Sequence, residues 1–283
     1  MLPQDSGGMV FFQYTFQDQN QNWHGNSEAP AANNVDKDLL TQSFTLGGRY
    51  MFNRSWGLQV QIPYDERRFQ TVGGATGNQL IGLHWTGFGD VRIQGLYTGL
   101  SKDMSSGLTF GVKLPTGSFS HEDGSDDIDR DSELGTGSTD ILLGGYYRHN
   151  LDRGNNLTLF TQVQLDIPVL TQDQYRPGVE VDAAAGIYYK GWMLHHLQIT
   201  PMAQVIATER TSDSGNYAAG QIDDDPGSGQ GSGYQRILLS PGVELDYGRW
   251  SLYADVEVPV FRDVGGNQLV SSWMVKMNVN FKF

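Results

Sequence analysis

The chain ends in the stretch Trp273 to Phe283 (WMVKMNVNFKF), in which apolar and polar side chains alternate. One face of this stretch is wholly apolar and carries Trp273, Val275, Met277, Val279, Phe281 and Phe283. The opposite face is mostly polar and carries Met274, Lys276, Asn278, Asn280 and Lys282. Because successive side chains of a strand point to opposite sides, this period of two predicts a β-strand with one apolar and one hydrated face.

The composition favours a membrane protein built from such strands. The chain has 283 residues, including 36 glycines, and 11% of its residues are aromatic. No run approaches the roughly 18 consecutive apolar residues of a membrane helix, whereas barrel strands interleave lipid-facing with lumen-facing residues and stay hydrophilic on average. The terminal strand ending in Phe283 resembles the closing strand of bacterial outer-membrane β-barrels. A soluble β-sandwich is the alternative, but it would have to hide far more outward aliphatic residues than one inner face can take.

The ends and the cysteine count suggest the compartment. The sequence has no cysteine, which fits an oxidising compartment and removes disulfide and cysteine–metal chemistry. Met1 to Asp5 has neither a basic nor an apolar leader segment, so we interpret the sequence as a mature chain with an added initiator Met. We expect the protein in the bacterial outer membrane.

We expect an all-β fold, a transmembrane antiparallel up-and-down β-barrel of 12 strands that forms a single domain over residues 1–283. The predicted strands are 8–17, 39–51, 56–66, 87–100, 106–116, 139–150, 156–169, 179–190, 194–207, 234–247, 250–261 and 268–283. Short and long connections alternate, and an even count places both termini on the short-turn, periplasmic side. Aromatic residues flank the short turns, as in the belt of a membrane interface: Tyr50, Trp56, Tyr147, Tyr189, Trp192, Tyr247, Trp250, Phe281 and Phe283.

The net charge of −13 lies entirely in the long connections. The most acidic of them, 116–138 and 207–233, carry −6 and −4. We therefore expect one acidic rim around a nearly neutral barrel. Nucleic acid is not an expected partner, because binding phosphates needs clustered Lys and Arg.

Three motifs between residues 86 and 140 carry a family resemblance. They are TGFGDV (86–91), LTFGVKLPTG (108–117) and LGTGSTD (134–140). Together they resemble the succession in an outer-membrane barrel family labelled for meta-pathway phenol degradation and described as transporters. The resemblance implies passage of small organic molecules through the outer membrane. The glycines have a second interpretation, as tight loop re-entries with positive φ.

A polar-aliphatic-proline triplet recurs near the predicted outer ends of four strands. Its copies are Gln61-Ile62-Pro63, Lys113-Leu114-Pro115, Asp166-Ile167-Pro168 and Glu257-Val258-Pro259. Since proline cannot donate to a ladder, each copy predicts a bulge or the end of pairing. By alternation the polar residue of each triplet faces the lumen, where the four could form a ring.

Alternation also predicts which charged side chains line the pore. The predicted pore-lining residues are Gln61, Arg92, Lys113, Asp166, Glu180, Asp182, Asp255, Glu257 and Lys276. We expect Arg92 and Lys113 on one wall to face Asp166, Asp182 and Glu257 across an open lumen. The alternative is that these charges form salt bridges that plug a structural barrel, since twelve strands fall between filled and wide barrels.

The sequence gives little support for a catalytic site or a metal site. The six histidines lie in no G-x-S-x-G or Ser-His-carboxylate setting, so we expect no enzyme, no catalytic residue and no cofactor. The acidic segment 121–133 spaces carboxylates two apart like a calcium loop, but Ser132 and Ser138 stand where an EF-hand needs Gly and Glu. We therefore predict no specific metal site there. A solvated rim near lipopolysaccharide is the favoured interpretation.

The favoured function is passive diffusion of small polar or amphipathic organic solutes through a monomeric channel in contact with outer-membrane lipid and lipopolysaccharide. The segment 117–138 is the expected gate. The alternative is a closed barrel that acts through its acidic loops as an adhesin or envelope structural protein, and a lipid hydrolase is less favoured.

Overall fold

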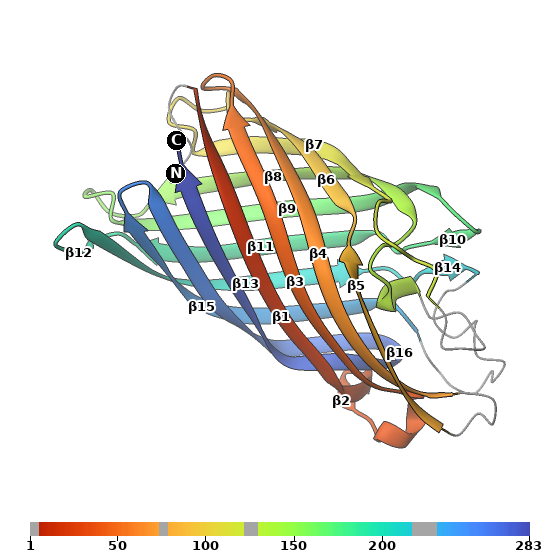
Figure 1. Cartoon of the computed structure of the whole chain (residues 1–283). Helices are drawn as coiled ribbons and strands as arrows, with labels where there is room; N and C mark the ends of the chain where they lie inside the picture. The colour runs from red at the N-terminus through yellow and green to blue at the C-terminus, as the bar shows by residue number, and fades with distance from the viewer. Residues whose placement is uncertain (1–5, 74–78, 122–129, 217–230) are drawn as a thin grey trace.

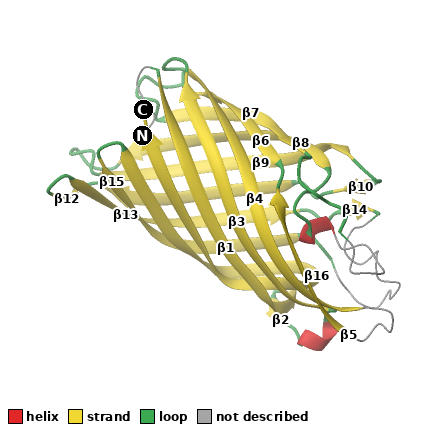
Figure 2. Ribbon diagram, viewed as in Figure 1, coloured by secondary structure: helices red, strands yellow, loops and turns green. Residues whose placement is uncertain are grey.

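The protein is a closed antiparallel β-barrel (Figures 1 and 2). This is a computed structural model that describes residues 6–73, 79–121, 130–216 and 231–283. Neighbours in the ring follow chain order, and the first element pairs with the last, so the expected all-β antiparallel barrel is confirmed. The ring consists of β1 (Gly7–Gly25), β3 (Asp36–Met51), β4 (Trp56–Gly73), β6 (Val91–Tyr97), β7 (Ser106–Leu114), β8 (Ser138–Asn150), β9 (Leu157–Thr171), β11 (Glu180–Tyr189), β13 (Leu197–Arg210), β15 (Tyr234–Tyr247) and β16 (Trp250–Lys282).

Eleven strand elements close this ring within the described residues, so the expected count of twelve is not confirmed. The last element, β16, is 33 residues long and covers both of the final predicted strands, 250–261 and 268–283. Its first part pairs with β15 and its second part with β1. Between them Gly266 adopts a positive φ of 75°, and Lys276 Nζ lies 2.6 Å from Glu257 Oε1. The two parts of β16 therefore run in opposite directions and lie side by side, because the chain reverses between them near Gly266.

Five strands of the described residues lie outside the ring. They are β2 (Ser27–Glu28), β5 (Gln79–Phe88) and β12 (Trp192–Leu194), which extend the sheet, and β10 (Tyr175–Arg176) and β14 (Ser214–Gly215), which pair with each other. Two single-turn 3-10 helices are η1 (Ala31–Asn33) and η2 (Arg130–Ser132). In the described part of the chain no helix has the length and apolar character to cross a membrane.

The wall beside β4 differs from the prediction in two ways. The predicted loop 67–86 is largely strand, because β4 continues to Gly73 and pairs there with β5. The predicted single strand 87–100 is broken at Gly89 and Asp90 into β5 and β6, which lie in line along β4. Polar residues occupy both faces of this outer hairpin, so its sequence lacks the alternation that marks a lipid-facing strand.

Outward apolar and inward polar residues alternate along the wall. Val10 and Phe12 are exposed on the outside, and Gln13 lines a cavity inside. The aromatic residues predicted beside the short turns are exposed on the outer surface, except for Phe281, which is half-buried. A small apolar core lies at the long-loop end and consists of Leu39, Phe69, Trp85 and Leu134.

The prolines of the repeated triplet lie where pairing changes. Pro115 directly follows the end of β7, and the ladder of β9 with β8 shifts register next to Pro168. A second register shift separates Pro259 from Phe261 where β16 pairs with β15. The interpretation of these prolines as bulges or strand ends is therefore confirmed at three positions. At Pro63 the neighbour of β4 changes from β6 to β5.

Candidate pore and its constriction

A cavity of about 940 Å³ occupies the barrel at the end of the short turns and of both termini; we call it the short-turn cavity. Arg49, Gln94, Gln164 and Gln204 line it together with Glu257. A second cavity of about 420 Å³, the mid-barrel cavity, lies beyond it. Its lining includes Gln61, Arg92, Lys113, Asp166 and Glu180 of the predicted pore set. The polar residues that face these cavities come from all sides of the barrel, as an aqueous path requires.

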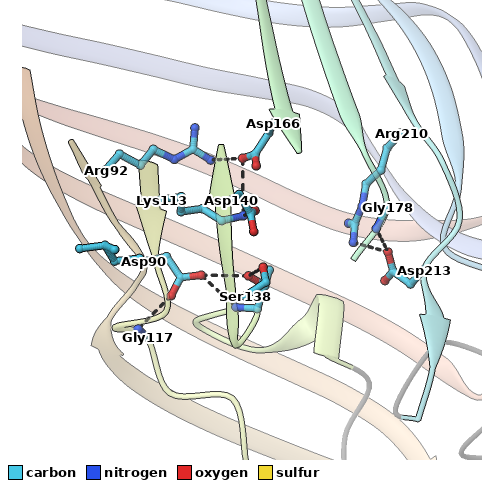
Figure 3. Close-up of polar contacts among 12 residues, drawn as sticks. Asp90, Arg92, Lys113, Gly117, Ser138, Asp140, Asp166, Gly178, Arg210 and Asp213 are labelled. Atoms are coloured by element: carbon cyan, nitrogen blue, oxygen red, sulfur yellow. Dashed lines mark hydrogen bonds and ion pairs between the residues drawn. The ribbon is translucent and has the colours of Figure 1, made fainter. Parts of the chain in front are cut away.

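A cluster of four charges lies on the wall of the mid-barrel cavity (Figure 3). Lys113 Nζ forms an ion pair with Asp140 and lies 3.5 Å from Asp166 Oδ2. Arg92 Nη2 reaches the same oxygen of Asp166 at 3.4 Å. Lys113, Asp140 and Asp166 are nearly closed to solvent, at 8%, 1% and 7% exposed, and Arg92 is partly exposed. Buried charges are tolerated when each has a partner, and here two cations serve two carboxylates.

The other predicted pore residues also have local partners. Asp182 accepts a hydrogen bond from Thr208 at 2.7 Å, and Glu180 accepts one from Tyr234 at 3.1 Å. Asp255 accepts from Ser240 at 2.5 Å and from Gln204 at 3.3 Å. Glu257 binds Lys276 within β16. Gln61 lies directly opposite Arg92 in the ladder of β4 with β6.

The expected opposition of Arg92 and Lys113 to Asp166 across an open lumen is wrong. All three side chains meet on the stretch of wall formed by β6 to β9, because the long basic side chains reach along the barrel surface. The predicted ring of four polar triplet residues is also incomplete. Gln61, Lys113 and Asp166 share the mid-barrel cavity, whereas Glu257 lines the short-turn cavity. The charges therefore cancel along the wall, and no transverse pair forms between Asp166 and its predicted partners.

The segment after β7 turns into the barrel, and Asp90 holds both of its ends (Figure 3). Asp90 Oδ1 accepts a hydrogen bond from the Gly117 amide, and Oδ2 accepts from the amide and hydroxyl of Thr136, all at 3.0–3.1 Å. We call the described residues 116–121 and 130–137 the inward loop. Leu134 of this loop packs into the core formed on β3, β4 and β5, and Thr136 lines the mid-barrel cavity. The loop therefore narrows the lumen.

The three sequence motifs meet at the hydrogen bonds that Asp90 accepts. Asp90 belongs to the first motif, Gly117 to the second and Thr136 to the third. Gly117 and Gly135 approach so closely that a Cβ on either would lie 2.7 Å from the backbone of the other. The predicted positive φ is found among these glycines at Gly137 (67°). The main role of the motif glycines is thus to let two backbone segments approach closely, and only Gly137 uses the positive φ that glycine permits.

The inward loop is bonded to two further loops. The Arg130 guanidinium is 3% exposed, lies 4.3 Å from the Phe119 ring centroid, and donates to Asp173 at 2.7 Å. Tyr175, also stacked on Arg130, is fully buried and donates to Asp213. Charge-assisted bonds of this kind are about twice as strong as neutral ones. They join the inward loop to the segments after β9 and β13.

Asp213 continues this network. Its carboxylate accepts from Arg210 and from the Gly178 amide, each at 2.7 Å (Figure 3), and its own amide donates to Ser232 at 2.8 Å. The inward loop and the segments around Asp173, Asp213 and Ser232 therefore form one hydrogen-bonded cap. Alternation could not identify Asp90, Arg130 or Asp213 as its organisers, because they lie outside the regular strands. The one available signal was that a carboxylate closes the first motif.

The calcium interpretation of 121–133 cannot be compared with the fold in full, because residues 122–129 lie outside the described residues. At its two ends Glu133 accepts from the His121 amide at 2.6 Å and lies 2.5 Å from the imidazole. The His121 ring stacks on Trp85. Glu133 therefore helps to hold the inward loop.

No protein-family model and no curated protein matches this sequence. Among solved structures, an outer-membrane channel from Pseudomonas putida F1 is similar with a TM-score of 0.67 and 13% identity, over 100% of this chain and 97% of that one. The β domain of the Bordetella autotransporter BrkA has a TM-score of 0.57 and 12% identity, over 99% and 100%. The resemblance to the phenol-degradation family is not confirmed. What these comparisons share with the chain is the closed β-barrel fold of outer-membrane proteins.

Proposed function

We propose that the protein is an outer-membrane channel for passive diffusion of small polar or amphipathic organic solutes. The observation that carries this proposal is the pair of polar cavities of about 940 and 420 Å³ inside a closed barrel. A barrel that served only as a scaffold would gain more by filling this space with packed side chains, because unfilled volume forfeits dispersion contacts. The similarity in fold to a channel from Pseudomonas putida F1 supports the same conclusion.

The inward loop is the proposed gate. It narrows the mid-barrel cavity, and its ends are fixed by Asp90 while its middle is bonded to Asp173. The same bonds favour the alternative of a permanently closed barrel that acts through its loops. Planar-bilayer recording separates the two, because a channel conducts in discrete steps and a closed barrel adds no conductance to the membrane.

Several finer features belong to this proposal. The two parts of β16 act as two spanning strands, which restores an even count of twelve and places both termini at the periplasmic face. The protein is a monomer whose outer surface contacts lipid and lipopolysaccharide. The role implied by the motifs in residues 86–140, transport of small organic molecules, belongs here too. It needs no catalytic group, and we propose no enzyme activity.

Charge selectivity should respond to the pair Glu257–Lys276 in the short-turn cavity. Glu257→Gln is expected to lower the preference for cations, and Lys276→Gln to raise it, because each change leaves the partner charge uncompensated beside the path. Both shifts should shrink in about 1 M salt, where the Debye length falls to about 3 Å. Reversal potentials in a KCl gradient measure them. Shifts of the same sign for the two variants would place the pair away from the path.

The membrane orientation can be tested with the exposed tryptophans. Trp56, Trp192 and Trp250 are each about half exposed beside the short turns. In liposomes, lipids brominated near the headgroup should quench these residues more than lipids brominated near the chain end, because aromatic belts lie at the interface. Trp85 is buried inside the barrel and is the internal reference. Equal quenching at both depths would contradict the proposed belt.

A further inference from the structure

Two arginines lie directly opposite each other near the long-loop end of the barrel. Arg236 of β15 and Arg262 of β16 are register partners in the antiparallel ladder. Both side chains line the same cavity, so they lie on the same, inner face of the sheet. Like charges directly opposite destabilise a sheet. A pairing of this kind therefore needs a reason other than stability of the empty barrel.

Neither arginine has an anionic partner in the described part of the chain. No carboxylate there lies within ion-pair distance of Arg236 or Arg262, and Arg236 Nε and Arg262 Nη1 are buried without a hydrogen-bond acceptor. The strand row that contains them continues through Thr208 to Asp182, whose charge acts on Arg236 from beyond contact distance. A buried donor without an acceptor costs about 1–3 kcal/mol. The donors are thus available to an acceptor that enters the cavity.

Aromatic rings hold the two guanidinium groups in place. Arg262 lies 4.6 Å from the ring centroid of Trp23, and Arg236 lies 5.2 Å from that of Tyr234. Stacking on a ring satisfies the face of a guanidinium and leaves the N–H groups at its edge free to bind. The two forks are therefore preorganised, which lowers the entropy lost when they bind an anion.

The cavity around them, which we call the arginine cavity, has a volume of about 280 Å³. Its described lining holds four arginines, since Arg67 and Arg210 join the pair, and a single acid, Asp36. The rest of its wall is partly apolar and includes Leu39, Phe69, Val264, Leu269 and Met274. Small-molecule sites combine an apolar wall with a few convergent polar groups, at volumes of roughly 300–1,000 Å³. This cavity lies just below the lower end of that range.

We infer that the arginine cavity binds small organic carboxylates, with the carboxylate held by Arg236 and Arg262 and an aromatic or short aliphatic body against the apolar wall. The planar fork of arginine matches a carboxylate bidentately, and the two opposed forks can serve both of its oxygens. An inorganic anion would leave the apolar wall unused, and a neutral solute would leave the arginine donors unmet. The inference rests on the proposed channel function, for which it names the solute class.

Benzoate is a suitable probe, and its binding can be measured by calorimetry on the full chain in detergent. Arg236→Gln and Arg262→Gln should each weaken benzoate binding about tenfold, and the double variant about a hundredfold. Arg68→Gln is the matched control, because Arg68 follows Arg67 in β4 but is exposed and binds Glu66. It should leave benzoate affinity unchanged. Benzyl alcohol and inorganic phosphate should both bind wild type more weakly than benzoate.

The unfolding temperature distinguishes a ligand-binding role of the two arginines from a structural role, because the two roles predict opposite changes. If the two arginines serve a ligand, Arg262→Gln relieves repulsion and keeps or raises the unfolding temperature without ligand. A lower temperature with unchanged benzoate affinity would overturn the inference, as would equal binding of phosphate or benzyl alcohol. A wild-type protein that conducts without binding benzoate refutes the site alone. One that binds benzoate but never conducts keeps the site and refutes the channel.

Discussion

Asp90→Ala is expected to raise the conductance of the channel severalfold, because it frees both ends of the inward loop. The substitution removes three hydrogen bonds accepted by one carboxylate. At about 1.5 kcal/mol or more for each bond to a charged group, the tie loses about 4–5 kcal/mol. This approaches the roughly 5.5 kcal/mol that converts a 1:99 equilibrium into 99:1. An open form that is rare in wild type should therefore dominate in single-channel records.

Two further variants serve as controls for the conductance of Asp90→Ala. Asp90→Asn keeps an acceptor oxygen and should give an intermediate conductance. Asp103→Ala changes an aspartate in the short turn between β6 and β7, at the opposite end of the barrel, and should leave conductance unchanged. Hydrogen exchange should show faster exchange at the amides of Gly117 and Thr136 in Asp90→Ala, since both lose their acceptor. If exchange accelerates there while conductance stays at the wild-type level, the inward loop is not the gate.

Lys113→Met is expected to cause the largest loss of stability among the lumen substitutions. It leaves the carboxylates of Asp140 and Asp166 buried side by side without their shared cation, and breaking a buried pair in this way costs about 3–5 kcal/mol. Lys276→Met removes a cation that is itself partly exposed, so water can take its place beside Glu257, and the loss should be smaller than for Lys113→Met. Urea unfolding in detergent micelles measures both losses.

A rescue variant makes this prediction specific to charge. Adding Asp140→Asn and Asp166→Asn to Lys113→Met should recover much of the lost free energy, because it removes the uncompensated charges and keeps the side-chain volumes. A triple variant as unstable as the single one would mean that Lys113 stabilises the barrel through packing of its methylene groups.

The sequence predicts the wall well where one face meets an apolar phase. Strand 234–247 has the predicted ends, and strand 139–150 differs by one residue. In both, alternate positions in the middle of the strand are apolar and exposed, as Ile141 and Leu143 or Ile237 and Leu239 are, so the period of two is clear. The outer hairpin of β4 and β5 lacks this constraint, because water or loops lie on both sides of it. Its strands could not be recognised from alternation for that reason.

The site was predicted less completely than the wall. Alternation places a charge inside the barrel, but which charges meet depends on how far a lysine or arginine reaches over neighbouring strands, as Arg92 does to Asp166. Net charge was also misleading at residues 262–268. The formal charges of Arg262 and Asp263 sum to zero, yet Arg262 lines a cavity and Asp263 is exposed. Because successive side chains of a strand point to opposite faces, the two charges lie on opposite sides of the barrel wall. The net charge of the segment does not show this.

The seam between β1 and β16 has a consequence for how the protein is made. Gly8 and Phe283 exchange two backbone hydrogen bonds, so two strands that are far apart in the sequence pair with each other (Figure 1). Hairpins between consecutive strands can form locally, but the seam joins positions separated by nearly the whole chain, which makes its closure the slow step. Until then two long edges stay unpaired and open to other chains. The barrel is therefore most prone to aggregation just before the seam closes. Loss of β1 or of the second part of β16 would leave a strand edge permanently unpaired.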